Sequence, residues 1–352
     1  MTAPQDALTD VPGMRIGHAQ RAADDRPGWL TGTTVVLAPE GGAVAGVDSR
    51  GGAPGTRETD ALDPRNVVER IHAVVLTGGS AFGLDSASGV VSWLEEQGRG
   101  VPVGPDPSQV VPVVPAAVLF DLGRGGDWRA RPDAALGREA VEDAASAEPG
   151  APVRQGNVGA GTGAVVGGMK GGTGTASTVL ASGVTVGAVT AVNAAGMAVH
   201  PGTGVLYGEL WDDRPPPVPG ESTHTEAQRR LAQAREETRQ RSAGVLRPPL
   251  NTTLAVIATD AVLTRAQARK AAGTAHDGLA RAVRPVHLMH DGDTVFSLAT
   301  GERALADGEF NDLLAAAADA LTRAMVKAVL AAEGVDGPGG VFPSYRDLYG
   351  RP

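Results

Sequence analysis

Residues 246–261 read LRPPLNTTLAVIATDA, and this stretch joins a polar, proline-rich segment to a run of almost wholly apolar residues. The run from Leu254 has the length and composition of a strand that is buried on both faces. Between the prolines and this strand stand Asn251, Thr252 and Thr253. The simple interpretation is a strand whose first residues are polar. The alternative is that Thr252 is a nucleophile, and that the chain cuts itself to expose it as a new N-terminus.

The pattern downstream of this strand is regular. Thr264 and Gln267 form a capping box for a helix that ends near Val283. A strand is predicted over 293–301, and a long alanine-rich helix over 311–334. The C-terminal part is therefore predicted to be a β-α-β-α module.

The part upstream alternates short apolar runs with Gly/Pro turns, which is typical of strands joined to covering helices. Strands are predicted within 31–40, 41–50, 72–80 and 115–123, helices over 81–100 and 133–146, and paired strands within 181–199 after a glycine-dense region at 156–177. Segment 212–250 is Pro-rich and polar, so we expect a linker whose cutting would cost no core contacts. Any helix within it is expected to lie on the surface. The whole pattern predicts a mixed α/β architecture.

The composition excludes several classes of protein. The 352 residues are 42% hydrophobic but only 3% aromatic, so the core is expected to consist of small aliphatic residues. The net charge is −9, without a basic patch, which argues against a nucleic-acid partner. The absence of cysteine excludes disulfides, thiol catalysis and cysteine-ligated zinc. No membrane-spanning run and no signal-peptide pattern are recognised, so we expect a cytoplasmic protein.

Cleavage of the Asn251–Thr252 bond would give the threonine hydroxyl a base. A free α-amine has an ordinary pKa of about 7.7–8, and a terminal threonine can use its own amine to activate its hydroxyl. The same hydroxyl can make the cut, by attacking the Asn251 carbonyl to form an ester that water hydrolyses. The uncut chain would need another base and an oxyanion donor for this step.

Four stretches together resemble the self-cleaving L-aminopeptidase D-amidase/esterase family, which includes β-peptidyl aminopeptidases and the nylon-oligomer hydrolase. They are ALTDVPGMRIGHA at 7–19, TVVLAPEGGAVAGVDSRGGAPGTRETD at 34–60, HAVVLTGGSAFGLDSASGVVSWLEEQGRG at 72–100 and NTTLAVIATDAVLTRAQARKAA at 251–272. The resemblance runs in matching order from about Ala7 to Gly350. It implies an α+β fold, a four-layer α/β/β/α sandwich also found in ornithine acetyltransferase, as one domain over 1–352.

The resemblance also implies processing of one precursor into a large chain, 1–251, and a small chain, 252–352, with 212–250 as the linker before the cut. Thr252 matches the family nucleophile, and Asn251 and Thr252 form the self-cleavage site. No metal or organic cofactor is expected. A homo-oligomer is expected, often a tetramer of cleaved pairs.

Four other positions match family site residues. Asn193 matches the asparagine whose side-chain amide stabilises the oxyanion, although on pattern alone it is a turn residue. Lys170, among glycines, matches a lysine near the nucleophile in the nylon-hydrolase branch, and can also be a loop charge. Asp291 and Asp293 match that branch's Asp-Gly-Asp, where two carboxylates could orient an ammonium group and steer protons, and Asp-Gly also favours a hairpin turn.

One position departs from the family. Phe120 stands where the nylon-oligomer hydrolase has a tyrosine near its nucleophile, which weakens a direct transfer of nylon-oligomer activity.

Two other signals are interpreted as non-functional. The glycine loops at 159–164 and 167–174 lack the βαβ context and the Gly-Lys-Ser/Thr of nucleotide sites, and are expected to line the pocket beside Lys170. His287 and His290 lie near the two aspartates, but strand alternation would direct them to opposite faces, which argues against a metal site.

The prediction is an N-terminal-nucleophile aminopeptidase or amidase that acts on short peptides or small amides through an acyl-enzyme on Thr252. Three alternatives stay open: a nylon-oligomer-type endo-amidase, acyl transfer to an amine, and an uncleaved protein that binds small ligands without catalysis. The physiological substrate and its stereochemistry are not predicted by the sequence.

Overall fold

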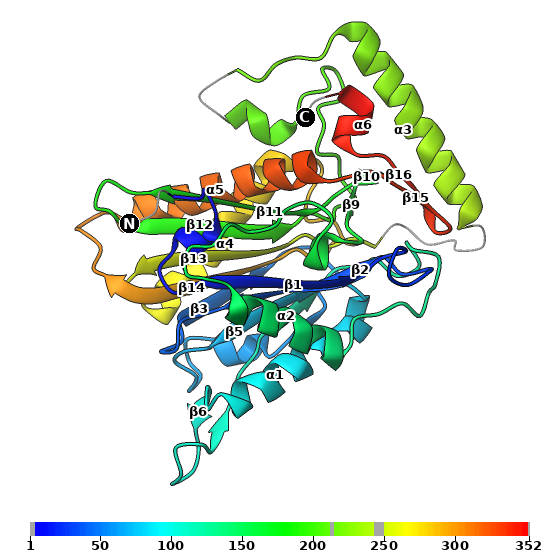
Figure 1. Cartoon of the computed structure of the whole chain (residues 1–352). Coiled ribbons are helices and arrows are strands. Elements are labelled where there is room, and N and C mark those ends of the chain that lie inside the picture. The colour runs from blue at the N-terminus through cyan, green and yellow to red at the C-terminus, as the bar shows by residue number, and fades with distance from the viewer. Residues whose placement is uncertain (1–3, 212–214, 243–249, 351–352) are drawn as a thin grey trace.

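The structure is a computed structural model that describes residues 4–211, 215–242 and 250–350. Two five-stranded sheets lie face to face in it (Figure 1). The first sheet has the order β1 (Arg15–Arg21), β2 (Thr31–Leu37), β5 (Ala73–Thr77), β8 (Ala116–Val118), β4 (Thr56–Arg57). The second has the order β11 (Thr173–Val179), β12 (Thr185–Ala191), β13 (Leu254–Ala261), β14 (Thr294–Arg303), β3 (Val44–Ser49).

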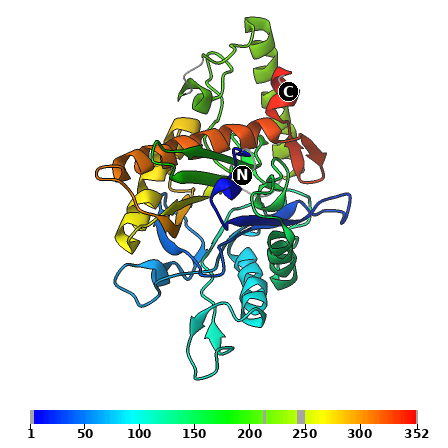
Figure 2. The same cartoon turned by 60° about the vertical axis from the view of Figure 1, so that its left-hand side comes forward.

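Helices cover the outer face of each sheet, and the turned view shows the same order of layers (Figure 2). α1 (Ser86–Glu96) and α2 (Ala134–Ser146) pack on the first sheet, while α4 (Arg265–Ala282) and α5 (Phe310–Ala331) pack on the second. The fold is thus the predicted α+β, four-layer α/β/β/α sandwich.

The central strand β13 explains why the two sheets stack. Leu254, Val256 and Ala258 belong to the apolar cluster between the sheets. Ala255 and Ile257 point to the opposite face and join the cluster beneath the helices α4 and α5. Alternate side chains of a strand point to opposite faces, so an uninterrupted apolar run is buried on both.

Small residues let the layers approach closely. A Cβ added at Gly17 in β1 would lie 2.2 Å from Ala140 O of α2, and one added at Gly174 in β11 would lie 2.1 Å from Ala324 O of α5. Either contact would force a helix away from its sheet. Glycine therefore stands at these two points of close approach between helix and sheet.

Most of the predicted elements are confirmed. The capping box of Thr264 and Gln267 is present at the start of α4. The helix predicted over 81–100 begins as a 3-10 turn, Ser80–Asp85, and becomes an α-helix only at Ser86. The paired strands predicted within 181–199 were wrong, because this range holds one strand, β12, which ends at Ala191. Its partner β11 lies in the glycine-dense region, where no strand was expected.

The predicted linker contains a long helix, α3 (Glu221–Arg241). A narrow stripe of this helix is buried: His224, Ala227, Leu231 and Ala234. It packs against α6 (Tyr345–Tyr349) and the hairpin of β15 (Val335–Gly337) and β16 (Gly340–Phe342), so much of this segment is attached to the C-terminal end of the chain (Figure 1). Residues 212–214 and 243–249 of the predicted linker lie outside the described residues.

Two further short pairs complete the fold. β6 (Val101–Pro102) and β7 (Val110–Val111) form a hairpin that projects from the body, and β9 (Val165–Val166) pairs with β10 (Met169–Lys170). None of the helices in the described ranges is long and apolar enough to cross a membrane.

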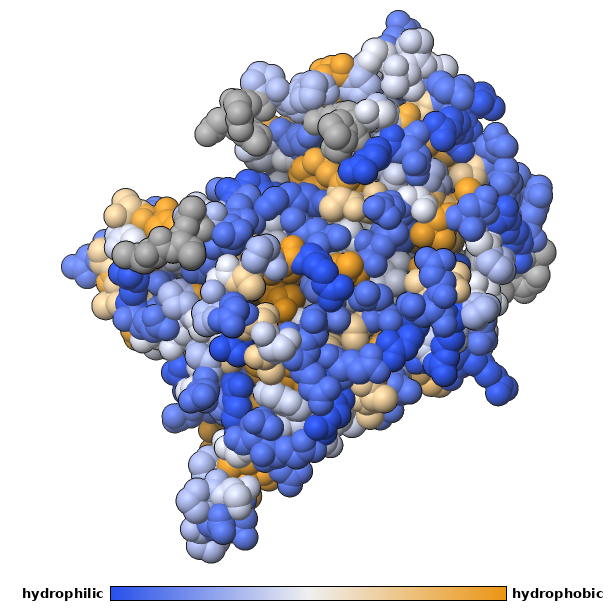
Figure 3. Space-filling view, viewed as in Figure 1, coloured by the Kyte–Doolittle hydropathy of each residue, from blue (hydrophilic) through white to orange (hydrophobic). Residues whose placement is uncertain are grey.

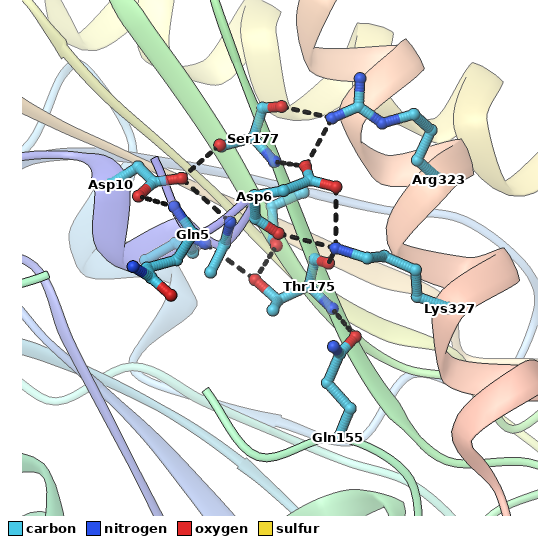
Figure 4. Close-up of polar contacts among 11 residues, drawn as sticks. Gln5, Asp6, Asp10, Gln155, Thr175, Ser177, Arg323 and Lys327 are labelled. Atoms are coloured by element: carbon cyan, nitrogen blue, oxygen red, sulfur yellow. Dashed lines mark hydrogen bonds and ion pairs between the residues drawn. The ribbon is translucent and has the colours of Figure 1, made fainter. Parts of the chain in front are cut away.

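The N-terminal segment is anchored to the second sheet and to α5 through Asp6 (Figure 4). Its carboxylate accepts hydrogen bonds from Ser177 N (2.8 Å), Arg323 Nη2 (2.7 Å) and Lys327 Nζ (2.9 Å). Lys327 also donates to the carbonyl of Thr175. Burial by itself would raise the pKa of Asp6, but these hydrogen bonds and charges outweigh it and lower the pKa.

We expect Asp6→Ala to lower the free energy of unfolding by about 1–2 kcal/mol at pH 7, since charge-assisted hydrogen bonds are lost from a partly exposed carboxylate. A lowered carboxylate pKa stabilises the fold above the ordinary aspartate pKa and loses that contribution as the pH falls. Thermal unfolding should therefore separate the wild type from Asp6→Ala most at pH 7, and the difference should shrink as the pH falls below 3.8. The exposed Asp24→Ala is the control, and an equal effect there would contradict a specific anchor.

Candidate active site

The topology of the second sheet brings the two predicted site segments together. β13 and β14 are parallel neighbours, so both strands begin at the same edge of the sheet. Asn251, just before β13, forms a bridge with Asp291, just before β14. Thr252, Asn251, Asp291 and Asp293 are all buried. The structure thus places the Asn-Thr-Thr and Asp-Gly-Asp motifs side by side.

The Thr252 hydroxyl lies against the peptide bond that precedes it. Its Oγ1 is 2.5 Å from Asn251 O, to which it donates a hydrogen bond, and it accepts one from Gly292 N at 3.1 Å. The Thr252 N–H donates to Asn193 O at 2.9 Å. A backbone N–H directed at Oγ1 stabilises negative charge there, which favours the nucleophilic form of the hydroxyl.

The side chain of Asn193, just after β12, is held in one orientation. Its Oδ1 accepts hydrogen bonds from Val165 N (3.0 Å) and Arg124 Nη1 (2.5 Å). Among the described residues, its Nδ2 reaches only Phe120 O, at a long 3.4 Å. Two donors on Oδ1 assign the other end of the amide as NH2, so Nδ2 is available to a developing oxyanion.

Arg124 is a site residue that the sequence analysis did not identify. Its Nη1 also donates to Gly163 O at 2.7 Å, and its Nη2 donates to Asn251 Oδ1 at 2.9 Å. It therefore connects Asn193 to Asn251, the residue before Thr252. Burial lowers the pKa of Arg124 to about 10, against the opposing charge of Asp121, so the guanidinium is still protonated at neutral pH.

The two aspartates have different partners. Asp293 Oδ1 accepts from Thr253 N at 2.8 Å, and its Oδ2 pairs with His287 Nδ1 at 2.8 Å. Asp291 Oδ2 accepts from Leu288 N at 3.1 Å. Burial and the charge of Asp293 raise the pKa of Asp291. Asp293 is thus bonded to the residue that follows Thr252.

His287 is a second residue whose role the sequence analysis missed. It lies in no strand and has a positive φ of 58°, so the alternation argument used for His287 and His290 was wrong. The strained backbone turns its imidazole toward Asp293. Within the described residues, no group of three or more His, Asp or Glu side chains is arranged to hold a metal ion.

Lys170 is fully buried in β10, one strand away from Asn193. It pairs in register with Val165, whose N–H holds Asn193. Its Nζ donates to the carbonyls of Gly161 (2.9 Å) and Gly171 (2.8 Å), which belong to the two glycine loops. Both loops thus contact Lys170, and that they line a pocket beside it stays a prediction. The hydrogen bonds described for the ammonium go to these loops and not to Thr252.

Burial, helped by the charge of Arg124 and opposed by that of Asp121, lowers the pKa of Lys170 to about 7. The ordinary pKa of lysine is about 10.4. Between this pH and about pH 7, Lys170 is protonated in the unfolded chain and neutral in the folded chain. The free energy of unfolding therefore rises between about pH 7 and 10 on account of Lys170. Below pH 7 the buried lysine is charged, and its full destabilising effect is present.

We expect Lys170→Met to remove this pH dependence. The melting temperature of the variant relative to wild type should be highest at pH 7 and should fall steadily toward pH 10. Lys270→Met, at an exposed position of α4, is the control and should show a constant difference. A constant difference for Lys170→Met as well would mean that Lys170 is charged throughout this range.

Comparison with known proteins gives one consistent result. The model of peptidase family S58 matches residues 6–342. An uncharacterized aminopeptidase of Mycobacterium tuberculosis (strain ATCC 25618 / H37Rv) is 47% identical, over 98% of each chain. A 6-aminohexanoate-oligomer endohydrolase of Kocuria sp. (strain KY2) is 30% identical, over 83% of this chain and 74% of its own.

Two solved structures share the fold. The Burkholderia sp. beta-aminopeptidase superposes with a TM-score of 0.71 at 23% identity, covering 100% of this chain and 97% of its own. The L-aminopeptidase D-Ala-esterase/amidase of Ochrobactrum anthropi, a variant of the Ntn hydrolase fold, gives 0.71 at 24%, covering 100% and 96%. These two likenesses show the fold, and the matched family model defines the class of protein as a peptidase. The chain belongs to peptidase family S58.

Proposed function

We propose that this protein is a self-processing amide hydrolase in which Thr252 first cuts its own chain and then acts as the N-terminal nucleophile. One observation carries the proposal. The buried Thr252 hydroxyl lies 2.5 Å from Asn251 O, with the Gly292 N–H directed at its oxygen. A hydroxyl held against the preceding carbonyl, with a donor that favours its anion, is arranged for attack on that carbonyl.

In the self-cleavage step, Thr252 Oγ1 forms a bond to the Asn251 carbonyl carbon while the C–N bond to Thr252 breaks. The hydroxyl proton ends on the released amine, and the product is an ester. Water then hydrolyses this ester, which leaves a carboxylate on Asn251 and restores the hydroxyl. The products are the chains 1–251 and 252–352.

In turnover, the freed α-amine of Thr252 takes the hydroxyl proton as Oγ1 attacks a substrate amide, and returns it to the leaving amine. Asn193 Nδ2 is assigned to the oxyanion. Asp293, through its bond to Thr253 N, and His287 behind it fix the start of the small chain. Asp291 supplies a second carboxyl near the ammonium, and Lys170 contributes positive charge when protonated.

Short peptides or small amides with a free amino end are the proposed substrates, because a relative at 47% identity is described as an aminopeptidase. A second candidate is a nylon-oligomer-type endo-amidase. The Asp291-Gly292-Asp293 motif and the 30% identity to the 6-aminohexanoate-oligomer endohydrolase favour it.

Alanine p-nitroanilide and its N-acetyl derivative distinguish the two candidates. An aminopeptidase should release nitroaniline from the free amine only, because the blocked substrate cannot place an ammonium in the site. Equal rates on both would favour the endo-amidase. Release from neither substrate, and from no other amide in a broad panel, would contradict the proposed function.

A cytoplasmic homo-oligomer, such as a tetramer of cleaved pairs, is also proposed. The projecting hairpin of β6 and β7 carries exposed Val103 and Val111, which suits a subunit contact. Most of the face in Figure 3 is hydrophilic, and its apolar side chains occur in small separate groups, one at the base of this hairpin.

A further inference from the structure

Before self-cleavage, Asn251 occupies the position that the acyl residue of a substrate takes in turnover. If Thr252 is the nucleophile as proposed above, the ester formed in self-cleavage carries Asn251 as its acyl group, and the ester formed in turnover carries the first residue of the substrate. Both esters are made on the same oxygen and stabilised by the same oxyanion donor. The groups that contact Asn251 therefore surround the acyl residue of a substrate.

Two contacts of Asn251 define its surroundings. Its backbone N–H donates to His290 O at 3.3 Å, beside the bridge with Asp291. This nitrogen corresponds to the α-amine of a substrate. Its side-chain Oδ1 accepts from Arg124 Nη2 at 2.9 Å. The α-amine of the acyl residue thus faces the carbonyl of His290, and its side chain faces the guanidinium of Arg124.

We propose that Arg124 is a specificity residue which selects amides whose acyl residue is asparagine or aspartate. The proposal rests on the proposed function and adds the substrate class to it. Arg124 is fixed by its Nη1, which donates to Asn193 Oδ1 and Gly163 O. When Asn251 leaves after cleavage, Nη2 loses its acceptor while the rest of the guanidinium stays in place.

The guanidinium of Arg124 determines which side chains of the substrate's acyl residue are favoured. A partly buried guanidinium without an acceptor is unfavourable, so leucine, which has nearly the shape of asparagine, is disfavoured. A site that hydrogen-bonds a substrate group rejects analogues that lack this group. The ratio of kcat/KM values is large when the site is fully buried. Arg124 is partly exposed, so water can replace part of the loss. A carboxylate forms the stronger, charge-assisted bond, which places aspartate at or above asparagine.

The test compares kcat/KM for the p-nitroanilides of aspartate, asparagine and leucine. For the wild type we expect asparagine to exceed leucine by at least about 10-fold, with aspartate equal to or above asparagine. In Arg124→Met this ratio should fall to about one. In Arg124→Lys, which keeps the charge, the preference for aspartate should persist. The ratio is the readout, because Arg124 also holds Asn193 and its loss lowers the rate on every substrate.

A second series needs no added substrate and keeps Arg124 intact. Self-cleavage of Asn251→Asp should match the wild type, and that of Asn251→Leu should be at least about 10-fold slower. Efficient hydrolysis of the leucine substrate, or a ratio unchanged in Arg124→Met, would overturn the specificity assignment and leave the proposed function intact. No hydrolysis of any amide together with no self-cleavage would overturn both.

Discussion

Thr252→Ala is expected to lower kcat on every amide substrate on the order of 10⁴- to 10⁶-fold, as is typical when a nucleophile is removed. In the proposed mechanism this hydroxyl forms the acyl-enzyme, and Gly292 N–H is directed at no other side-chain oxygen in the described contacts. Without self-cleavage the variant also lacks the free α-amine that serves as base. Release of nitroaniline under single-turnover conditions measures both effects together.

Two controls make this result specific. Thr252→Ser keeps a hydroxyl at the same atom, so it should retain self-cleavage and measurable hydrolysis. Thr253→Val changes the neighbouring buried threonine, whose Oγ1 donates to Asn193 O at 3.3 Å, and should retain most of the activity. Activity in Thr252→Ala close to that of Thr253→Val would contradict the assignment of the nucleophile.

Asn193→Ala is expected to lower kcat by about 10²- to 10³-fold with little change in KM, which is the effect of removing one oxyanion donor. The reason lies in the fixed orientation of the amide, with Oδ1 held by Val165 N and Arg124 and with Nδ2 left to donate. The loss should fall on kcat because the interaction forms only in the transition state. Steady-state kinetics on a single p-nitroanilide separates the two constants.

Asn193→Asp is the matched variant. It keeps an acceptor for Val165 N and Arg124 and replaces Nδ2, the proposed donor, with a second acceptor. We expect its kcat to fall at least as far as that of Asn193→Ala. A variant Asn193→Asp with near-normal kcat would show that the side chain serves only to hold the loop, and another group would have to bind the oxyanion.

The fold was largely predictable because local signals and tertiary packing agree. The apolar run of β13, the capping box at Thr264 and the alanine-rich α5 each specify their element within the residues concerned. β11 was missed because Gly174 and the small polar residues around it lack a strand pattern. The glycine is required by the close approach of α5, which no local signal reports.

Residues of the candidate site could be predicted from the sequence only where they lie in a short motif. Asn251, Thr252 and the two aspartates lie in two short motifs, and the parallel pairing of β13 with β14 brings these motifs together. Arg124 lies in a glycine-rich loop without periodicity, and its contacts with Asn193 and Asn251 span 69 and 127 residues of the chain. Such long-range contacts of loop residues cannot be inferred from a local sequence pattern.

Intact-mass measurement of the purified protein under denaturing conditions, with N-terminal sequencing of the smaller species, tests the central claim most directly. Cleavage before Thr252 leaves 101 of the 352 residues in the small chain, so we expect two species of roughly 25 and 10 kDa in proportion to 35.6 kDa, the smaller one beginning TTLAV. Thr252→Ala should stay whole. A wild-type protein that remains a single species of 35.6 kDa after long incubation would contradict self-processing and the role of Thr252 as an N-terminal nucleophile.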